Sequence, residues 1–141
     1  MCLFYSKYHT AKLRKELKTK GKITVYKYLV KNKTLKSFFY NYKWKIGENV
    51  SNREHHPWND FKTYIDCGFH VYLDRKVAKE YASASEVIVK FTAKVEDFVA
   101  ADKPHKEFTK AGCGKIFIAQ EAVFSKLTLQ KSTWEKIFAK K

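Results

Sequence analysis

The sequence predicts an α+β domain, in which a curved, mostly antiparallel sheet of six to seven short strands is combined with three short helices. Short runs rich in β-branched and aromatic residues recur along the chain between turn residues, which is typical of strands. Three other stretches repeat apolar residues at helical spacing. A length of 141 residues fits a single domain over 1–141.

The predicted strands share high β propensity and end at turn residues. They run over Ile23 to Val30, Leu35 to Trp44, Glu86 to Val95, Lys115 to Ala119 and Val123 to Leu129. The third is the clearest, because Val87, Val89, Phe91, Ala93 and Val95 alternate with polar residues. The first two are expected to form a hairpin around the turn 31–34.

Each helix is predicted from a capping residue and an apolar stripe. Thr10 is suited to cap a helix over Ala11 to Thr19 that ends at Gly21. The stretch Ser132-Thr133-Trp134-Glu135 has the capping-box pattern and predicts a helix near the C-terminus.

The stretch 67–82 combines a strand with a helix. Gly68 stands before a short apolar run, where no side chain fits or where φ is unusual. Asp74 is a good N-cap for a helix that begins at Arg75, and Tyr81 lies on its apolar face.

Charge is the most unusual feature of the composition. The net charge is +15, and residues 1–45 hold thirteen of the 29 basic residues against one acid, Glu16. Such an uneven distribution of positive charge favours an acidic partner, of which nucleic acid is the commonest. Because lysine far outnumbers arginine, attraction to phosphate is expected more than reading of base edges.

The charge and the aromatic rings occur together in the N-terminal third, and this pattern predicts a binding surface. Aromatic rings that alternate with lysines can stack on bases beside a rim that attracts phosphate, although at least half of the rings are expected in the core. The candidate binding residues are Lys12, Lys15, Lys18, Lys36, Tyr40, Tyr42, Lys43 and Lys45.

Candidate catalytic residues are few. Cys2 becomes N-terminal if Met1 is removed, and Cys113 lies between two glycines in a lysine-rich loop that would lower its pKa. His70 and Tyr72 could serve in a cleft where either meets Glu121 or Glu86.

The sequence gives no prediction of a cofactor and only a broad prediction of cellular location. Cys67 and His70 have zinc-like spacing, with His55, His56 and Cys113 as further ligands, but no second close pair exists, and we predict neither a metal site nor a cofactor. Three widely spaced cysteines favour an intracellular setting, in a host cytoplasm or a virion, over secretion. No apolar run approaches the length of a membrane span. The oligomeric state is left open.

Several short motifs resemble a group of small uncharacterised proteins of phages, large DNA viruses and bacteria. They are Met1-Cys2-Leu3, Val25-Tyr26-Lys27, Ser37 with Tyr42 and Gly47, Gly68-Phe69-His70-Val71-Tyr72, and Val87-Ile88-Val89-Lys90. This resemblance implies a viral or phage origin and no activity, and Phe38 replaces the expected proline.

Gly68, His70 and Tyr72, followed by Ala78 and Tyr81, also resemble the ADP-ribosyltransferase fold more weakly. That resemblance implies chemistry on NAD, but Tyr26-Lys27 replaces the His-Gly of the fold, and Glu121 is expected to follow its strand instead of beginning it.

Three functions follow as hypotheses. The first is a non-enzymatic basic binding module that contacts an acidic partner: nucleic acid, a nucleotide, or an acidic host or virion protein. The second is an ADP-ribosyltransferase-like or cysteine-dependent enzyme. The third is a virion structural protein, associated with the genome or a minor part of the capsid.

Overall fold

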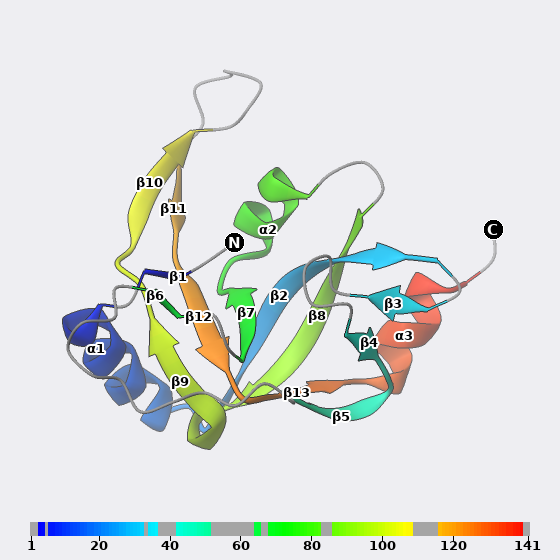
Figure 1. Ribbon diagram of the computed structural model, residues 1–141, viewed down its shortest axis with the longest axis horizontal. Helices are drawn as coiled ribbons and strands as arrows, with labels where there is room; N and C mark the ends of the chain where they lie inside the picture. Colours follow the sequence, from blue (N-terminus) through cyan, green and yellow to red (C-terminus); the bar gives the residue numbers. More distant parts are fainter. Residues whose placement is uncertain are drawn as a thin grey trace.

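Three α-helices and an open antiparallel sheet confirm the predicted α+β fold in the computed structural model (Figure 1). The structure describes residues 3–4, 6–32, 34–36, 42–51, 64–65, 68–82, 86–108 and 116–139. The helices are α1 (Lys7–Lys18), α2 (Arg75–Tyr81) and α3 (Lys131–Ile137), with a 3-10 turn η1 (Val95–Asp97). The strands are β1 (Leu3–Phe4), β2 (Lys22–Lys31), β3 (Leu35–Lys36), β4 (Lys43–Trp44), β5 (Gly47–Val50), β6 (Tyr64–Ile65), β7 (Phe69–Tyr72), β8 (Glu86–Lys94), β9 (Phe98–Ala101), β10 (His105–Phe108), β11 (Ile116–Ala119), β12 (Glu121–Phe124) and β13 (Lys126–Leu129).

The main sheet has the strand order β5-β13-β8-β2-β7-β12-β9, and all its pairings are antiparallel. Strand β3 pairs with β2, and β4 pairs with β3. In the described residues, β1 with β6 and β10 with β11 form two separate pairs.

Connectivity forces this sheet to curve. Strands β12 and β13 are joined by Ser125 alone, yet β8, β2 and β7 lie between them in the strand order. Their ends can meet only if the sheet curls, and Figure 1 shows β12 leading into β13 at the lower end of the sheet. The Ser125 amide donates to the Asp97 carbonyl, and its carbonyl accepts from the Ser51 amide, each at 2.9 Å, which fixes the corner.

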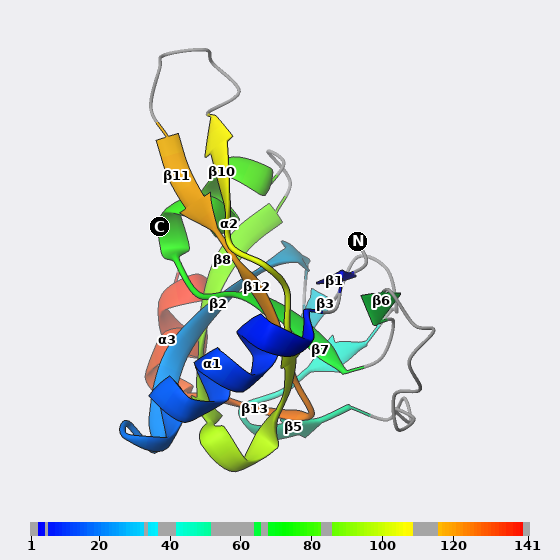
Figure 2. The ribbon, with the colours of Figure 1, turned by 90° about the vertical axis from the view of Figure 1, so that its left-hand side faces the viewer.

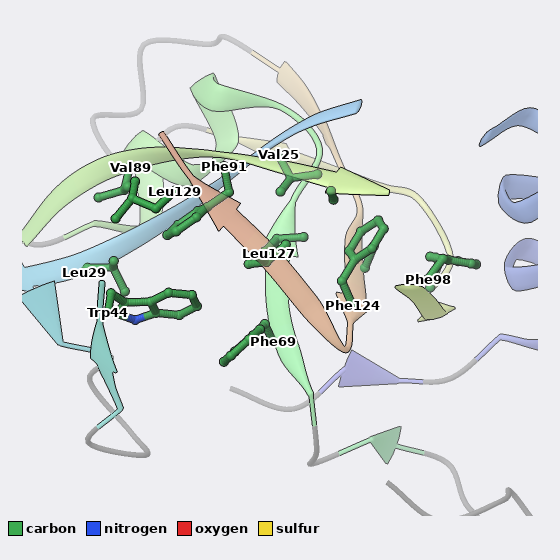
Figure 3. Packing of buried hydrophobic residues seen from close by; sticks show 14 of the residues in the cluster. Val25, Leu29, Trp44, Phe69, Val89, Phe91, Phe98, Phe124, Leu127 and Leu129 are labelled. Carbon is green, nitrogen blue, oxygen red and sulfur yellow. The ribbon is translucent and has the colours of Figure 1, made fainter. Parts of the chain in front are cut away.

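The main core lies inside the curved sheet (Figure 3). The Trp44 ring packs against Phe69 and Phe91, with ring centres 4.5 and 4.8 Å away. A second, smaller cluster lies on the opposite face, where Val77 and Ala78 of α2 pack against Tyr72.

The alternation predicted for Glu86 to Val95 is confirmed in β8. Val89, Phe91 and Ala93 are buried in the main core, and Val87 and Val95 pack against it. The predicted entry to α2 is also confirmed. Gly68 has φ +78, a Cβ there would lie 2.5 Å from Val123 Cγ1, and the Asp74 side chain accepts from the Lys76 amide at 2.8 Å.

Two predicted helix starts are wrong. Helix α1 begins one turn earlier than expected and is capped by Ser6, while Thr10 is buried and exchanges hydrogen bonds with both backbone groups of Ala101. Helix α3 begins at Lys131, so Ser132 lies inside it and does not cap it.

Two predicted strands are also divided. The run Leu35 to Trp44 contains β3 and β4, which pair antiparallel with each other, so the chain reverses inside it. The run Val123 to Leu129 contains parts of β12 and β13, because Ser125 turns the chain from β7 and β9 toward β5 and β8.

Candidate functional site

A glutamate and a tyrosine from two neighbouring strands form the centre of the candidate site. Glu121 begins β12 and lies directly opposite Tyr72 of β7 in the ladder. The Tyr72 hydroxyl is hydrogen-bonded to the Glu121 carboxylate. The expectation that Glu121 follows a strand without beginning one is therefore corrected, since β11 ends at Ala119 and Glu121 opens the next strand.

Three tyrosine rings are stacked in a row at this centre. The Tyr72 ring lies parallel to that of Tyr81, with centres 5.5 Å apart, and nearly parallel to that of Tyr28, with centres 6.2 Å apart. The rings come from α2, β7 and β2, so the stack ties the helix to the sheet. Burial and the charge of Glu121 raise the pKa of Tyr72, which keeps its hydroxyl protonated and able to donate.

Lys27 of β2 is a positively charged residue whose charge acts on Glu121. Strands β2 and β7 share one register pair, Tyr26 with Tyr72, and beside it the Lys27 ammonium donates to the His70 carbonyl at 2.8 Å. Burial lowers the pKa of Lys27 to about 8, although the negative charge of Glu121 acts in the opposite direction. Lys27 therefore links two strands where their ladder is short.

The pKa of the Glu121 carboxyl lies close to neutral pH. Burial, followed by the negative charge of Asp102, raises the pKa of Glu121 to about 7, although Tyr72 and Lys27 favour the ionised form. Asp102 is itself fixed, because its carboxylate accepts the Glu121 amide at 3.0 Å. A carboxyl with such a pKa can take up or release a proton under physiological conditions.

The other catalytic candidates lie around this centre or outside the described residues. His70 is half-buried on β7 opposite Val123, and its carbonyl is the acceptor for Lys27. Glu86 begins β8, and its charge acts on Tyr28. Cys2 and Cys113 lie outside the described residues.

The predicted lysines of α1, together with Lys7, which was not predicted, lie exposed along the helix. Thr10, Leu13 and Leu17 face the core, while the opposite side carries exposed lysines. We call this the α1 lysine face; its members are Lys7, Lys12, Lys15 and Lys18. Arg14 instead turns inward, donating to the Val99 carbonyl at 3.2 Å with its guanidinium 5.1 Å from the Phe98 ring centre.

Lys43, Lys45 and Tyr42 do not join this face. Lys43 and Lys45 are exposed, but they lie around β4, at the opposite end of the sheet from α1 in Figure 1. Tyr42 packs with its ring 4.8 Å from Trp44, and its hydroxyl donates to Asn49 at 3.2 Å. The Tyr42 ring is partly buried at the margin of the core, and its role in stacking stays a prediction.

Two predicted binding residues have no described side chain. Lys36 is described as part of β3 by its backbone, and Tyr40 lies outside the described residues. Both stay predictions, and neither enters the site.

Three residues of the centre were missed from the sequence: Lys27, Tyr28 and Asp102. A signal existed for Lys27, because it alternates onto the same strand face as Val25 and Leu29, which are both buried. No local pattern marks Asp102, whose role depends on a pairing between β9 and β12.

Two further kinds of feature are absent from the described ranges. No three of their His, Cys, Asp and Glu side chains are grouped to hold a metal ion, and Cys67, His55, His56 and Cys113 lie outside those ranges. No helix among the described residues is both long and apolar enough to cross a membrane.

No protein-family model matches the chain, and neither a curated protein nor a solved structure matches it. The candidate site therefore rests on the geometry and chemistry of its own residues.

Proposed function

We propose that the protein is a small basic binding module that contacts an acidic partner through the α1 lysine face. One observation carries the proposal: α1 buries Thr10, Leu13 and Leu17 and presents its four lysines to solvent. Exposed lysines attract phosphate or carboxylate groups without needing a preformed pocket. Lys20 and Lys22, also exposed, extend the positive charge beyond the end of the helix.

Matched charge reversals test this proposal. Lys15→Glu with Lys18→Glu should weaken binding to polyphosphate, whereas Lys43→Glu with Lys45→Glu changes net charge equally on a distant surface. The slope of log affinity against log salt should fall by roughly 0.7–0.9 for each lysine that contacts a phosphate. Equal weakening by both double variants would mean that only net charge matters, and no weakening by the Lys15 and Lys18 reversal would refute the proposal.

An enzyme is the second candidate, favoured by the hydrogen bond between Tyr72 and Glu121. The pair lies beside Tyr26 on adjacent strands, and the weaker resemblance to ADP-ribosyltransferases makes NAD the substrate to test. The candidate ranks second because Glu121 is only 8% exposed and Tyr72 only 6%.

Labelled NAD separates the two candidates. If the enzyme hypothesis holds, the protein releases nicotinamide or transfers the label, Glu121→Gln abolishes this, and Glu16→Gln does not. Glu16 is a suitable control because it is exposed on α1. Absence of turnover by the unaltered protein would remove the candidate. A cysteine-dependent reaction, a viral origin and an intracellular setting stay predictions.

A further inference from the structure

An exposed tyrosine lies in line with the lysines of α1. Tyr8 is 68% exposed, the largest exposed fraction among the described large apolar and aromatic side chains. At 100° per residue, Tyr8, Lys12 and Lys15 fall within about 60° of one another around the helix. This direction is opposite to that of the buried residues of α1. Figure 2 shows α1 on the outside of the molecule, with one side open to solvent.

The Tyr8 ring is held in place from one side. The His9 ring meets it edge-on, with centres 4.8 Å apart and planes at 89°. His9 is in turn anchored, since its Nδ1 lies 2.8 Å from the Ser6 hydroxyl that caps the helix. Tyr8 therefore offers a ring in a restrained position, which lowers the entropy lost when a planar group stacks on it.

We propose that the α1 lysine face binds single-stranded nucleic acid, with an unpaired base stacked on Tyr8 and the adjacent phosphates on Lys12 and Lys15. This inference rests on the proposed function and names its partner. Every base has a flat face that an aromatic ring can cover, whereas the bases of a duplex are already stacked inside it. The stripe from Tyr8 to Lys15 is about 10 Å long, which corresponds to roughly three stacked nucleotides.

The residue types also favour this partner over others. Lysine contacts phosphate as a point charge and gives no bidentate reading of guanine, so little sequence preference is expected. The acid on this helix, Glu16, is exposed and lies about 40° from Lys12, on the side of Lys12 that faces away from Tyr8. An acidic protein would satisfy the lysines but leave an exposed tyrosine without a planar partner.

Fluorescence anisotropy with three probes tests the inference: a 12-nucleotide oligothymidylate, the same length of duplex, and polyphosphate. An oligouridylate arm distinguishes RNA from DNA. The unaltered protein should bind the single strand more tightly than the duplex. Tyr8→Ala should weaken binding to the single strand about 5- to 100-fold and leave polyphosphate binding within about twofold. Tyr8→Phe, which keeps the ring, should bind like the unaltered protein.

Val50→Ala is the matched control, because Val50 is an apolar residue 54% exposed on β5, away from α1. The inference is overturned if Tyr8→Ala leaves the single strand unaffected, if it weakens polyphosphate equally, or if the duplex binds as tightly as the single strand. The proposed function fails separately, when the Lys15 and Lys18 reversal leaves polyphosphate binding intact. Circular dichroism should show that each variant is folded, as expected for exposed positions.

Discussion

Replacing Glu121 with glutamine should change how stability depends on pH. The folded protein holds the Glu121 proton up to about pH 7, whereas the unfolded chain loses it near 4.5. Between these values unfolding releases a proton, so stability contributed by this group is fully present below 4.5 and is lost as pH rises through 7. The shift of about 2.5 pKa units corresponds to about 3 kcal/mol. Glutamine keeps the shape and carries no charge, so Glu121→Gln should lose this dependence.

Urea unfolding at a series of pH values measures the effect, with tryptophan fluorescence as the signal because Trp44 is buried. The difference in unfolding free energy between Glu121→Gln and the unaltered protein should grow by about 3 kcal/mol from pH 4.5 to 8. Lys27, with a pKa of about 8, stays protonated over most of this range. Comparison with the variant cancels groups on which Glu121 does not act, such as Asp97, whose pKa burial also raises. Glu16→Gln is the control. A difference that stays constant with pH would refute the assignment of a buried, proton-holding carboxyl.

Three further substitutions test the surroundings of this centre. Gly68→Ala should destabilise the fold by about 2–5 kcal/mol in urea unfolding, because φ is +78 and the new Cβ would lie 2.5 Å from Val123. Gly21→Ala is the control: φ is +77 there, but the space around it is open, so the loss of stability should be only about 1–2 kcal/mol. Asp74→Ala should cost about 1 kcal/mol through loss of the α2 cap, and Asp74→Asn should restore most of it. Lys27→Met removes a charge that favours ionised Glu121, so the pH at which stability falls should rise; no movement of that midpoint would contradict the coupling.

Local patterns were enough to predict the fold class and several elements. The alternation in β8 and the glycine and cap around α2 are properties of short segments, and the structure has both where the pattern predicts them. The predicted start of α1 was wrong for a long-range reason, because Ser6 and Thr10 are both suitable capping residues by type. What separates them is the hydrogen bonding of Thr10 to Ala101, far away in the sequence.

The candidate site was only partly predictable for the same reason. Tyr72 and Glu121 were each selected from the sequence, but their meeting depends on the register of β7 with β12. The alternation of aromatic rings near Trp44 is the same whether those rings face solvent or the core. In the structure the Trp44 ring packs against Tyr42 and Phe69, which the local pattern could not predict. The α1 lysines were predictable because a helix with few apolar residues must expose the rest.

The corner at Ser125 also has a consequence for how the chain acquires its shape during synthesis. Residues 121–129 supply a paired neighbour to β5, β7, β8 and β9, and Gly47 finds its partner Leu129 across more than half of the chain. Until this segment has left the ribosome, those four strands have open edges, and contacts this distant in sequence form slowly. The sheet must therefore be completed after residues 1–120 have been translated, with the nine-residue segment 121–129 as its last structural component.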